Sequence, residues 1–178
     1  MTEETAGSRT ACLLPFLQKG VTQIAWVVRD LEESVRSFHA LLGVGPWHFY
    51  KYGRPLLSMM RRNGRDAEYA MDTAVTNAGV TRLELIQPLE GDTVFHEFVN
   101  RKGYGRIHHL GLAVENMEES LAVVRTGGID VLMEGGGYGL DGDGHFAFLD
   151  TEGLVGTMLE LMQRPKRRHE PYRVFPTP

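Results

Sequence analysis

The feature of this sequence that most restricts its fold is an internal duplication. Residues 21–44 read VTQIAWVVRDLEESVRSFHALLGV, and residues 106–129 read RIHHLGLAVENMEESLAVVRTGGI. A constant offset aligns Gln23 with His109, and the tripeptide EES occurs at the same place in both copies. A repeated passage of this kind predicts two modules of similar structure within one fold.

A second, shorter repeat follows each copy and carries an acidic residue. LELIQ at 83–87 and LELMQ at 159–163 align Glu84 with Glu160. Either glutamate alone is most simply interpreted as the solvated face of an amphipathic strand. A carboxylate inside an apolar segment must otherwise be paired or bound to a metal, because burying it alone is costly. Two at equivalent positions, each accompanied by an amide or an imidazole, favour metal binding.

The repeated passage predicts a strand followed by a helix. VTQIAWVV alternates in the manner of a strand, and Asp30 with Glu33 forms a capping box that predicts a helix through about residue 42. Asn116 and Glu119 repeat the same signal in the second copy. Each half therefore begins with a β-α unit.

Further strand-like segments complete each half, so that both halves are predicted to be β-α-β-β-β. These segments are residues 47–52, 55–60, 67–76, 81–88, 129–134, 145–150 and 156–162. The fold class is α+β, with two tandem βαβββ modules forming curved, mostly antiparallel sheets around a central cavity. The predicted divisions are a leader (1–18), the first module (19–92), a connecting helix (93–104), the second module (105–163) and an extended C-terminal arm (164–178). We expect that arm to be solvated, with packing across a partner subunit as the alternative.

Composition narrows the classes of function. The chain has 178 residues, a net charge of −4 and a pI near 6.0, which argue against a nucleic-acid-binding protein. No apolar segment approaches the roughly 20 residues that span a bilayer, so no membrane association is predicted. Cys12 is the only cysteine, which is typical of a reducing compartment. We therefore expect a cytoplasmic protein.

The two repeats together predict one metal site. Gln23 and His109 alternate onto the same strand faces as the small residues Ala25 and Gly111, which leave room for a cavity. His108 alternates to the opposite face. One nitrogen and three oxygen ligands suit a divalent Zn, Ni, Co, Mn or Fe ion without distinguishing among them. The candidate metal ligands are Gln23, Glu84, His109 and Glu160.

These residues resemble those of the vicinal oxygen chelate superfamily, which includes glyoxalase I, methylmalonyl-CoA epimerase, extradiol dioxygenases and bleomycin-resistance proteins. The resemblance covers roughly residues 20–163. The segments QPLEGDT through GRIHHLGLAV and FLDTEGLVGTMLEL are most similar to methylmalonyl-CoA epimerases. Those epimerases place a histidine where this chain has Gln23. The quartet Gln, Glu, His, Glu instead resembles eukaryotic glyoxalase I.

The resemblance implies a metal-dependent isomerase or lyase that moves a proton next to a carbonyl or thioester. Glu160 and Glu84 are then the candidate catalytic bases, with Glu68 or Asp72 as a further carboxylate by likeness to the epimerases. The implied partner is a small molecule, either an acyl-CoA or another thioester, and the implied assembly is a homodimer. Candidate substrate contacts are Trp47, Phe49, Asp72 and His145.

Two other functions remain open within the same superfamily. One is a non-catalytic, drug-sequestering protein, although such members generally lack the ligand quartet. The other is an extradiol dioxygenase, which needs two histidines and one carboxylate around Fe(II). Gln23 occupies the place of one of those histidines, so this second alternative is less favoured.

Overall fold

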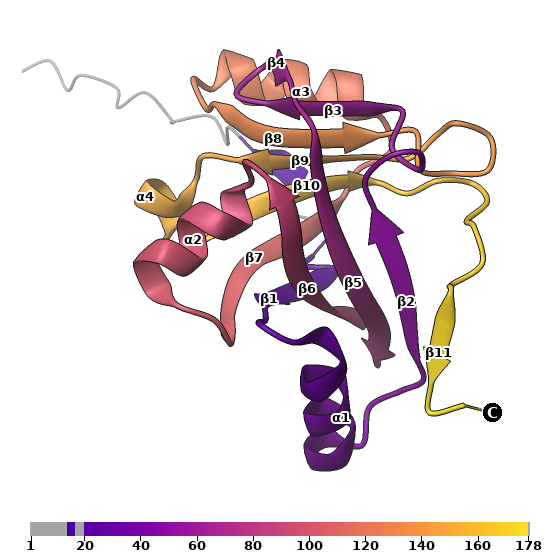
Figure 1. Cartoon of the computed structure of the whole chain (residues 1–178). Helices are drawn as coiled ribbons and strands as arrows, with labels where there is room; N and C mark the ends of the chain where they lie inside the picture. The colour runs from indigo at the N-terminus through magenta and orange to yellow at the C-terminus, as the bar shows by residue number, and fades with distance from the viewer. Residues whose placement is uncertain (1–13, 17–19, 178) are drawn as a thin grey trace, which may run out of the picture.

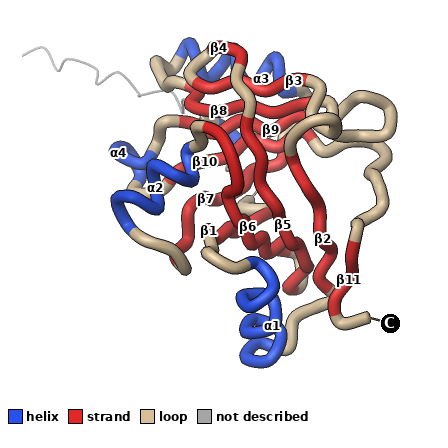
Figure 2. The backbone as a smooth tube through the Cα atoms, viewed as in Figure 1, coloured by secondary structure: helices blue, strands red, loops and turns tan. Residues whose placement is uncertain are grey.

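The described residues, 14–16 and 20–177 of a computed structural model, form one curled eleven-stranded sheet with helices packed against it (Figures 1 and 2). The expected leader, residues 1–18, lies almost entirely outside the described residues. The strands are β1 (Gln23–Val27), β2 (Trp47–Tyr52), β3 (Met59–Arg62), β4 (Arg65–Asp66), β5 (Tyr69–Ala78), β6 (Thr81–Gly91), β7 (Arg106–Ala113), β8 (Val131–Gly136), β9 (His145–Leu149), β10 (Met158–Gln163) and β11 (Arg173–Phe175). The helices are α1 (Leu31–Leu42), α2 (Val94–Lys102), α3 (Met117–Thr126) and α4 (Glu152–Val155).

The two repeats form two equivalent halves of this sheet. The strand order is β11-β2-β5-β6-β1-β7-β10-β9-β8-β3-β4, so that β2-β5-β6-β1 from the first half meets β7-β10-β9-β8 from the second. The halves join through the antiparallel pair β1–β7, and only β1–β6 and β7–β10 are parallel among the described strands. The mostly antiparallel arrangement is confirmed, but the two expected sheets are continuous with each other.

The two predicted capping boxes are confirmed at their N-caps. The Asp30 side chain accepts a hydrogen bond from the Glu33 amide at 2.9 Å, and Asn116 accepts one from the Glu119 amide at 3.2 Å. Each cap satisfies an amide that the first helical turn leaves without a partner. Helix α1 covers the first half and α3 covers the second, which keeps both helices off the inner face of the sheet (Figure 1).

One strand of the first half pairs with the second half instead. The sequence predicts a strand at 55–60, but β3 begins at Met59 and pairs with β8. Arg62 at its end is buried, and its guanidinium donates to the Leu132 carbonyl at 2.7 Å and pairs with Glu97 on α2. The β3–β4 hairpin therefore fastens the first half to the edge of the second.

The C-terminal arm is packed on the domain, contrary to the expectation of a solvated tail. Strand β11 adds to the edge strand β2, with Arg173 opposite Phe49, and the Tyr172 amide donates to the Phe49 carbonyl at 3.0 Å. Earlier in the arm, the Leu140 amide donates to the Arg167 carbonyl at 3.0 Å. These backbone bonds exist because an edge strand presents unpaired amides and carbonyls to any extended segment nearby.

No helix among the described residues is long and apolar enough to cross a membrane.

The caps give a test of the duplicated β-α units. Asp30→Ala and Asn116→Ala are each expected to lower the free energy of unfolding by about 1 kcal/mol, because each leaves one helix amide without its acceptor. The two losses add in the double variant, since the caps share no partner. Urea denaturation measures both. Glu33→Ala is the control, because it keeps the backbone amide that Asp30 caps. If it lowered the free energy of unfolding as much as Asp30→Ala does, the assignment of Asp30 as the N-cap would be wrong.

Candidate metal centre

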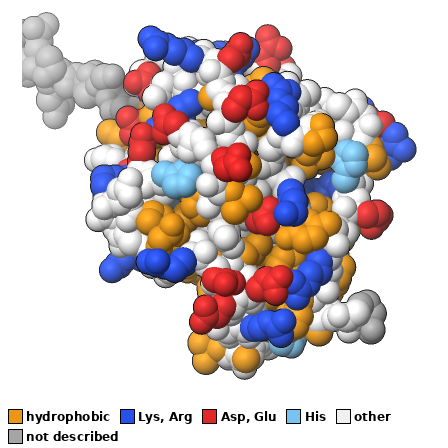
Figure 3. All heavy atoms as spheres, in the orientation of Figure 1, with side chains coloured by type: hydrophobic (Ala, Val, Ile, Leu, Met, Phe, Trp, Pro, Cys, Tyr) orange, Lys and Arg blue, Asp and Glu red, His pale blue; other side chains and the backbone are white. Residues whose placement is uncertain are grey.

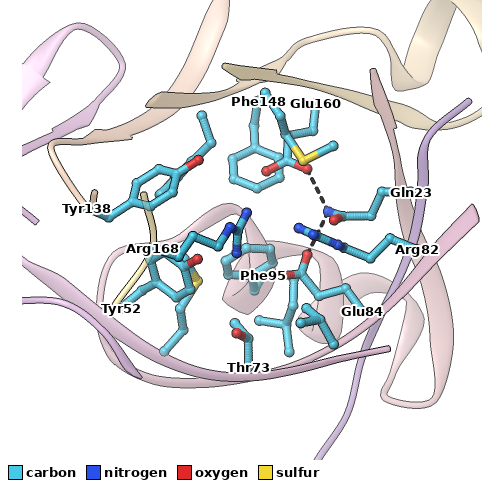
Figure 4. Close-up of a pocket in the computed structure, with 15 residues that line it drawn as sticks. Gln23, Tyr52, Thr73, Arg82, Glu84, Phe95, Tyr138, Phe148, Glu160 and Arg168 are labelled. Carbon is cyan, nitrogen blue, oxygen red and sulfur yellow. Dashed lines mark hydrogen bonds between the residues drawn. The ribbon is translucent and has the colours of Figure 1, made fainter. Parts of the chain in front are cut away.

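The four predicted ligands lie on four neighbouring strands at the centre of the sheet. Glu84 is on β6, Gln23 on β1, His109 on β7 and Glu160 on β10, and these strands are consecutive in the sheet order. Figure 4 shows Gln23, Glu84 and Glu160 pointing toward one another into the same cavity. The duplication thus places one pair of ligands in each half and brings the pairs together where the halves join.

Small residues separate the ligands along the strands. Gly111 lies opposite both Gln23 and Glu160, and Ala25 lies opposite both Glu84 and His109. A Cβ atom on Gly111 would stand 2.7 Å from the Gln23 Cβ and 3.3 Å from Glu160 Oε2. Ala25 and Gly111, which are equivalent in the two repeats, are therefore small residues because the ligand side chains occupy the space beside them.

The donor atoms form a compact cluster. Gln23 Nε2 donates to Glu84 Oε2 at 2.8 Å and to Glu160 Oε2 at 2.9 Å. His109 Nε2 lies 3.1 Å from Glu160 Oε2 and 3.8 Å from Glu84 Oε2. Ligands at about 2.1 Å from one ion stand roughly 3.0–3.4 Å apart, so these separations bracket the values that one ion requires.

A divalent metal fits this donor set. His109 is fully buried, and its Nε2 has no hydrogen-bond partner among the described residues although it faces two carboxylates. Turning the Gln23 amide by 180° exchanges its nitrogen for Oε1, which can bind a cation. The four side chains would then hold the ion with one nitrogen and three oxygens, a set that Zn, Co, Ni, Mn and Fe(II) accept.

The two carboxylates destabilise each other without a cation. Burial, and next the nearby Glu160 carboxylate, raises the pKa of Glu84 to about 7, while His109 opposes the shift. Two negative charges that converge on one buried point repel, and two carboxylates balance the charge of one divalent ion. The electrostatics of the cluster therefore favour a cation at its centre.

A neighbouring histidine is positioned to orient the histidine ligand. Strand alternation predicts that His108 faces away, but the register of β1 against β7 shifts at Ala25, and the resulting bulge brings His108 Nδ1 within 2.9 Å of His109 Nδ1. Burial, and next His109, lowers the pKa of His108 well below its usual value. A neutral His108 accepts a hydrogen bond from the Nδ1–H group of His109 and so leaves the His109 Nε2 lone pair free for the site.

The walls of the cavity come from both halves and from the C-terminal arm. They include the side chains Tyr52, Thr73, Arg82, Phe95, Tyr138, Phe148 and Arg168 (Figure 4). Thr73 Oγ1 is buried without a partner among the described residues, and burial raises the pKa of Tyr52 to about 12. The space left between these side chains is about 30 Å³, close to the volume of one water molecule. In this arrangement the cavity accommodates an ion or a water.

Sequence analysis did not identify the two arginines in these walls. Arg82 stands two residues before Glu84 on β6, so strand alternation places the two on one face and would have revealed it. Arg168 lies in the arm, far from the repeats in sequence, and carries no such signal. Only the path of the arm across the molecule brings it to the cavity.

The predicted substrate contacts do not converge on this cavity. Trp47 and Phe49 are buried in the core beneath α1. Asp72 lines an outer groove of about 800 Å³ and pairs with Lys51 at 3.6 Å. His145 pairs with Glu134 at 3.1 Å and does not line the cavity. Glu68, the alternative carboxylate, pairs with Arg54 at 3.3 Å on the surface.

Fold and site together define a class of protein. It is a half-barrel of two paired modules within one chain, with four potential metal ligands at the junction of the modules. The chain belongs to the Glyoxalase/Bleomycin resistance protein/Dioxygenase superfamily, whose family profile matches residues 22–148. The resemblance and the vicinal oxygen chelate fold expected from the sequence are therefore confirmed.

Several known proteins are similar to this chain. The mitochondrial methylmalonyl-CoA epimerase of Bos taurus is 24% identical over 143 residues, covering 80% of this chain and 73% of the relative. The crystal structure of methylmalonyl-CoA epimerase from Mycobacterium tuberculosis superposes with a TM-score of 0.61 at 17% identity, covering 89% of this chain and 93% of that one. A Streptomyces coelicolor methylmalonyl-CoA epimerase variant in complex with 2-nitronate-propionyl-CoA has a TM-score of 0.55 at 20% identity, covering 81% and 96%. At these identities the solved structures establish the fold.

The raised pKa of Glu84 predicts how stability depends on pH in the metal-free protein. A carboxyl whose pKa rises from 4.5 to about 7 on folding stabilises the fold below pH 4.5, and this contribution is lost as pH rises to about 7. The shift corresponds to a change on the order of 3 kcal/mol. Glu84→Gln should remove this dependence, so that the variant unfolds at higher denaturant concentration than the wild type at pH 8 but not at pH 4.

Denaturation curves in chelator at both pH values measure this difference. Glu68→Gln is the control, since its carboxylate is exposed beside Arg54. If the free energy of unfolding of the wild type did not fall, relative to that of Glu84→Gln, as the pH rises from 4.5 to 7, the Glu84 carboxylate would not carry a buried charge.

Proposed function

We propose that this protein is a metal-dependent isomerase that moves a proton on the carbon next to a carbonyl or thioester, of methylmalonyl-CoA epimerase type. The observation that carries the proposal is the convergence of Gln23, Glu84, His109 and Glu160 from four adjacent strands. The similarity to methylmalonyl-CoA epimerases supports the same assignment. A lyase of glyoxalase I type, which the quartet resembles, is the neighbouring possibility within this reaction class.

The four side chains would hold a divalent ion. When bound, such an ion supplies a Lewis acid that stabilises negative charge on a substrate oxygen. Burial on the inner face of the sheet keeps water from competing with these groups, since Gln23, His109 and Glu160 are each at most 5% exposed. His108 holds the His109 ring in one orientation.

The two carboxylates supply the proton transfer. Glu84 and Glu160 reach the cavity from opposite halves of the sheet. In the proposed reaction, one carboxylate removes a proton from one face of a substrate carbon and the other returns a proton to the opposite face, as inversion at that carbon requires. Carboxylates serve as general bases and acids of this kind in enzymes.

The principal competing function is non-catalytic binding of an apolar molecule, for which the superfamily also has members. The outer groove of about 800 Å³ beside the arm gives this alternative some support, because Leu56, Leu89 and Leu140 line it. The buried quartet has no use in such a protein. Metal content and turnover distinguish the two functions.

The catalytic roles predict an exchange experiment on the separate epimers of methylmalonyl-CoA. In D₂O the wild type should exchange the α-proton of both epimers and interconvert them. Glu160→Gln and Glu84→Gln should each lower net epimerisation by about 100-fold or more, since proton transfer by a positioned group contributes at least that much. Each variant should retain exchange with a different epimer. Proton NMR follows the exchange, and elemental analysis checks that each variant still carries metal.

Glu134→Gln is the matched control, because Glu134 is also a buried glutamate but pairs with His145 outside the cavity. Full turnover in metal-loaded Glu160→Gln would refute its role as a base. Wild-type protein that carries metal yet exchanges neither epimer would move the assignment to another carbonyl substrate, for which a 2-oxoaldehyde–thiol adduct is the next test.

The small residue between the ligands predicts a metal-binding phenotype. Gly111→Ala places a methyl group against the Gln23 Cβ and close to Glu160 Oε2, so both ligands must shift. We expect the affinity for Co²⁺ or Zn²⁺ to fall by about tenfold or more, as when groups that orient a ligand are lost. Isothermal titration calorimetry measures the affinity. Gly153→Ala, where an added Cβ meets no atom within 4 Å, should leave it unchanged.

A further inference from the structure

We propose that Arg82 and Arg168 form an anion subsite beside the metal centre, which binds a carboxylate or phosphate oxyanion of the substrate. The subsite deepens the proposed function, and rests on it, because it assumes that the reacting carbon lies at the quartet. It restricts the substrate class to anionic carbonyl or thioester compounds.

The two guanidinium groups enter the cavity from different elements. Arg82 comes from β6 and Arg168 from the C-terminal arm, and Figure 4 shows both side chains pointing into the space above Glu84. The same two arginines also line an adjoining cavity of about 250 Å³ on their other side. This second cavity is large enough for a carboxylate or phosphate group, unlike the 30 Å³ at the quartet.

Neither arginine is in an ion pair with a described residue. Within the described part of the chain, no carboxylate oxygen lies within 4.0 Å of the Arg82 or Arg168 guanidinium nitrogens. Arg167 and Arg173 of the same arm are paired, with Asp141 and Glu32 respectively.

The charge balance of the loaded site leaves a positive excess. A divalent ion neutralises Glu84 and Glu160, so the charges of Arg82 and Arg168 are then uncompensated within the cavity. Two guanidinium groups with no counter-ion in a partly buried site attract an oxyanion, and guanidinium geometry suits the two oxygens of a carboxylate or phosphate.

The rest of the adjoining cavity is compatible with an anion. Its lining includes the hydrogen-bonding side chains His48, Tyr50, Thr76 and Asn77, and no acidic residue. On the molecular face in Figure 3, by contrast, acidic and basic side chains are interspersed. The charges of Arg82 and Arg168 therefore meet no acidic side chain in the lining of this cavity.

The arm sets the position of Arg168. Arg168 forms a backbone bridge with Gly139, and the carbonyl of Arg167 accepts from the Leu140 amide at 3.0 Å. Successive side chains of the extended arm point to opposite sides, which sends Arg167 out to Asp141 and Arg168 inward. Arg167 is therefore a matched control for Arg168: the same residue type, one position away, facing solvent.

Calorimetric titration with small probes tests the subsite. Malonate, inorganic phosphate and the uncharged analogue malonamide are each titrated into metal-free and Co²⁺-loaded protein. We expect an anion to bind and malonamide not to bind. Arg82→Gln and Arg168→Gln should each weaken anion binding by about tenfold in both forms, since one charge-assisted hydrogen bond is worth at least that factor. Arg167→Gln should bind as the wild type does, and thermal melts check that every variant is folded.

The pattern of results decides the source of the oxyanion. Tighter malonate binding indicates a substrate carboxylate, and tighter phosphate binding indicates a phosphate ester. Equal affinities in Arg168→Gln and Arg167→Gln, or malonamide binding as tight as malonate binding, would overturn the subsite. Arginine-dependent anion binding to a protein that takes up no Co²⁺ would refute the proposed function alone. Co²⁺ uptake with arginine-independent anion binding would refute the subsite alone.

Discussion

The pairing of β1 with β7 is the interaction on which the rest of this structure depends. It joins the two halves into one sheet, and its register sets Gln23 opposite Gly111 and Ala25 opposite His109. The flanking parallel strands then bring Glu84 and Glu160 to the same two small residues. A shift of one residue at this junction would turn alternate side chains to the outer face and disperse the cluster. The site is thus a property of the junction more than of either half.

The charges buried at this junction explain why the site needs a metal ion and an anionic substrate. Two buried carboxylates repel each other, and burial together with this repulsion raises the pKa of Glu84. A cation at the quartet relieves the repulsion but leaves Arg82 and Arg168 without counter-charge. The proposed anionic substrate completes the balance. The metal, the carboxylates, the arginines and the substrate then form one set of charges that compensate one another. Burying any one of them without the others would cost free energy.

Much of the fold and the quartet could be predicted because both depend on local pattern. The capping residues Asp30 and Asn116 and the matched LELIQ and LELMQ strands recur at fixed places, and strand alternation gives the face of each side chain. Alternation failed at His108, because a bulge in the register is set by the partner strand. It also could not show that Trp47 and Phe49 face α1 instead of the cavity, since alternation groups the side chains of a strand by face without saying which face meets the cavity.

The sequence by itself determined the duplication, the class of fold and the four candidate ligands, because these rest on residue identity and on periodicity along a strand. Tertiary structure alone decided which edges pair. In the folded chain β3 of the β3–β4 hairpin pairs with β8, and the arm pairs with β2, so that Arg168 reaches the cavity. Such long-range pairings depend on which backbone groups remain free at a sheet edge, and that information is distributed over the whole fold and absent from any short segment.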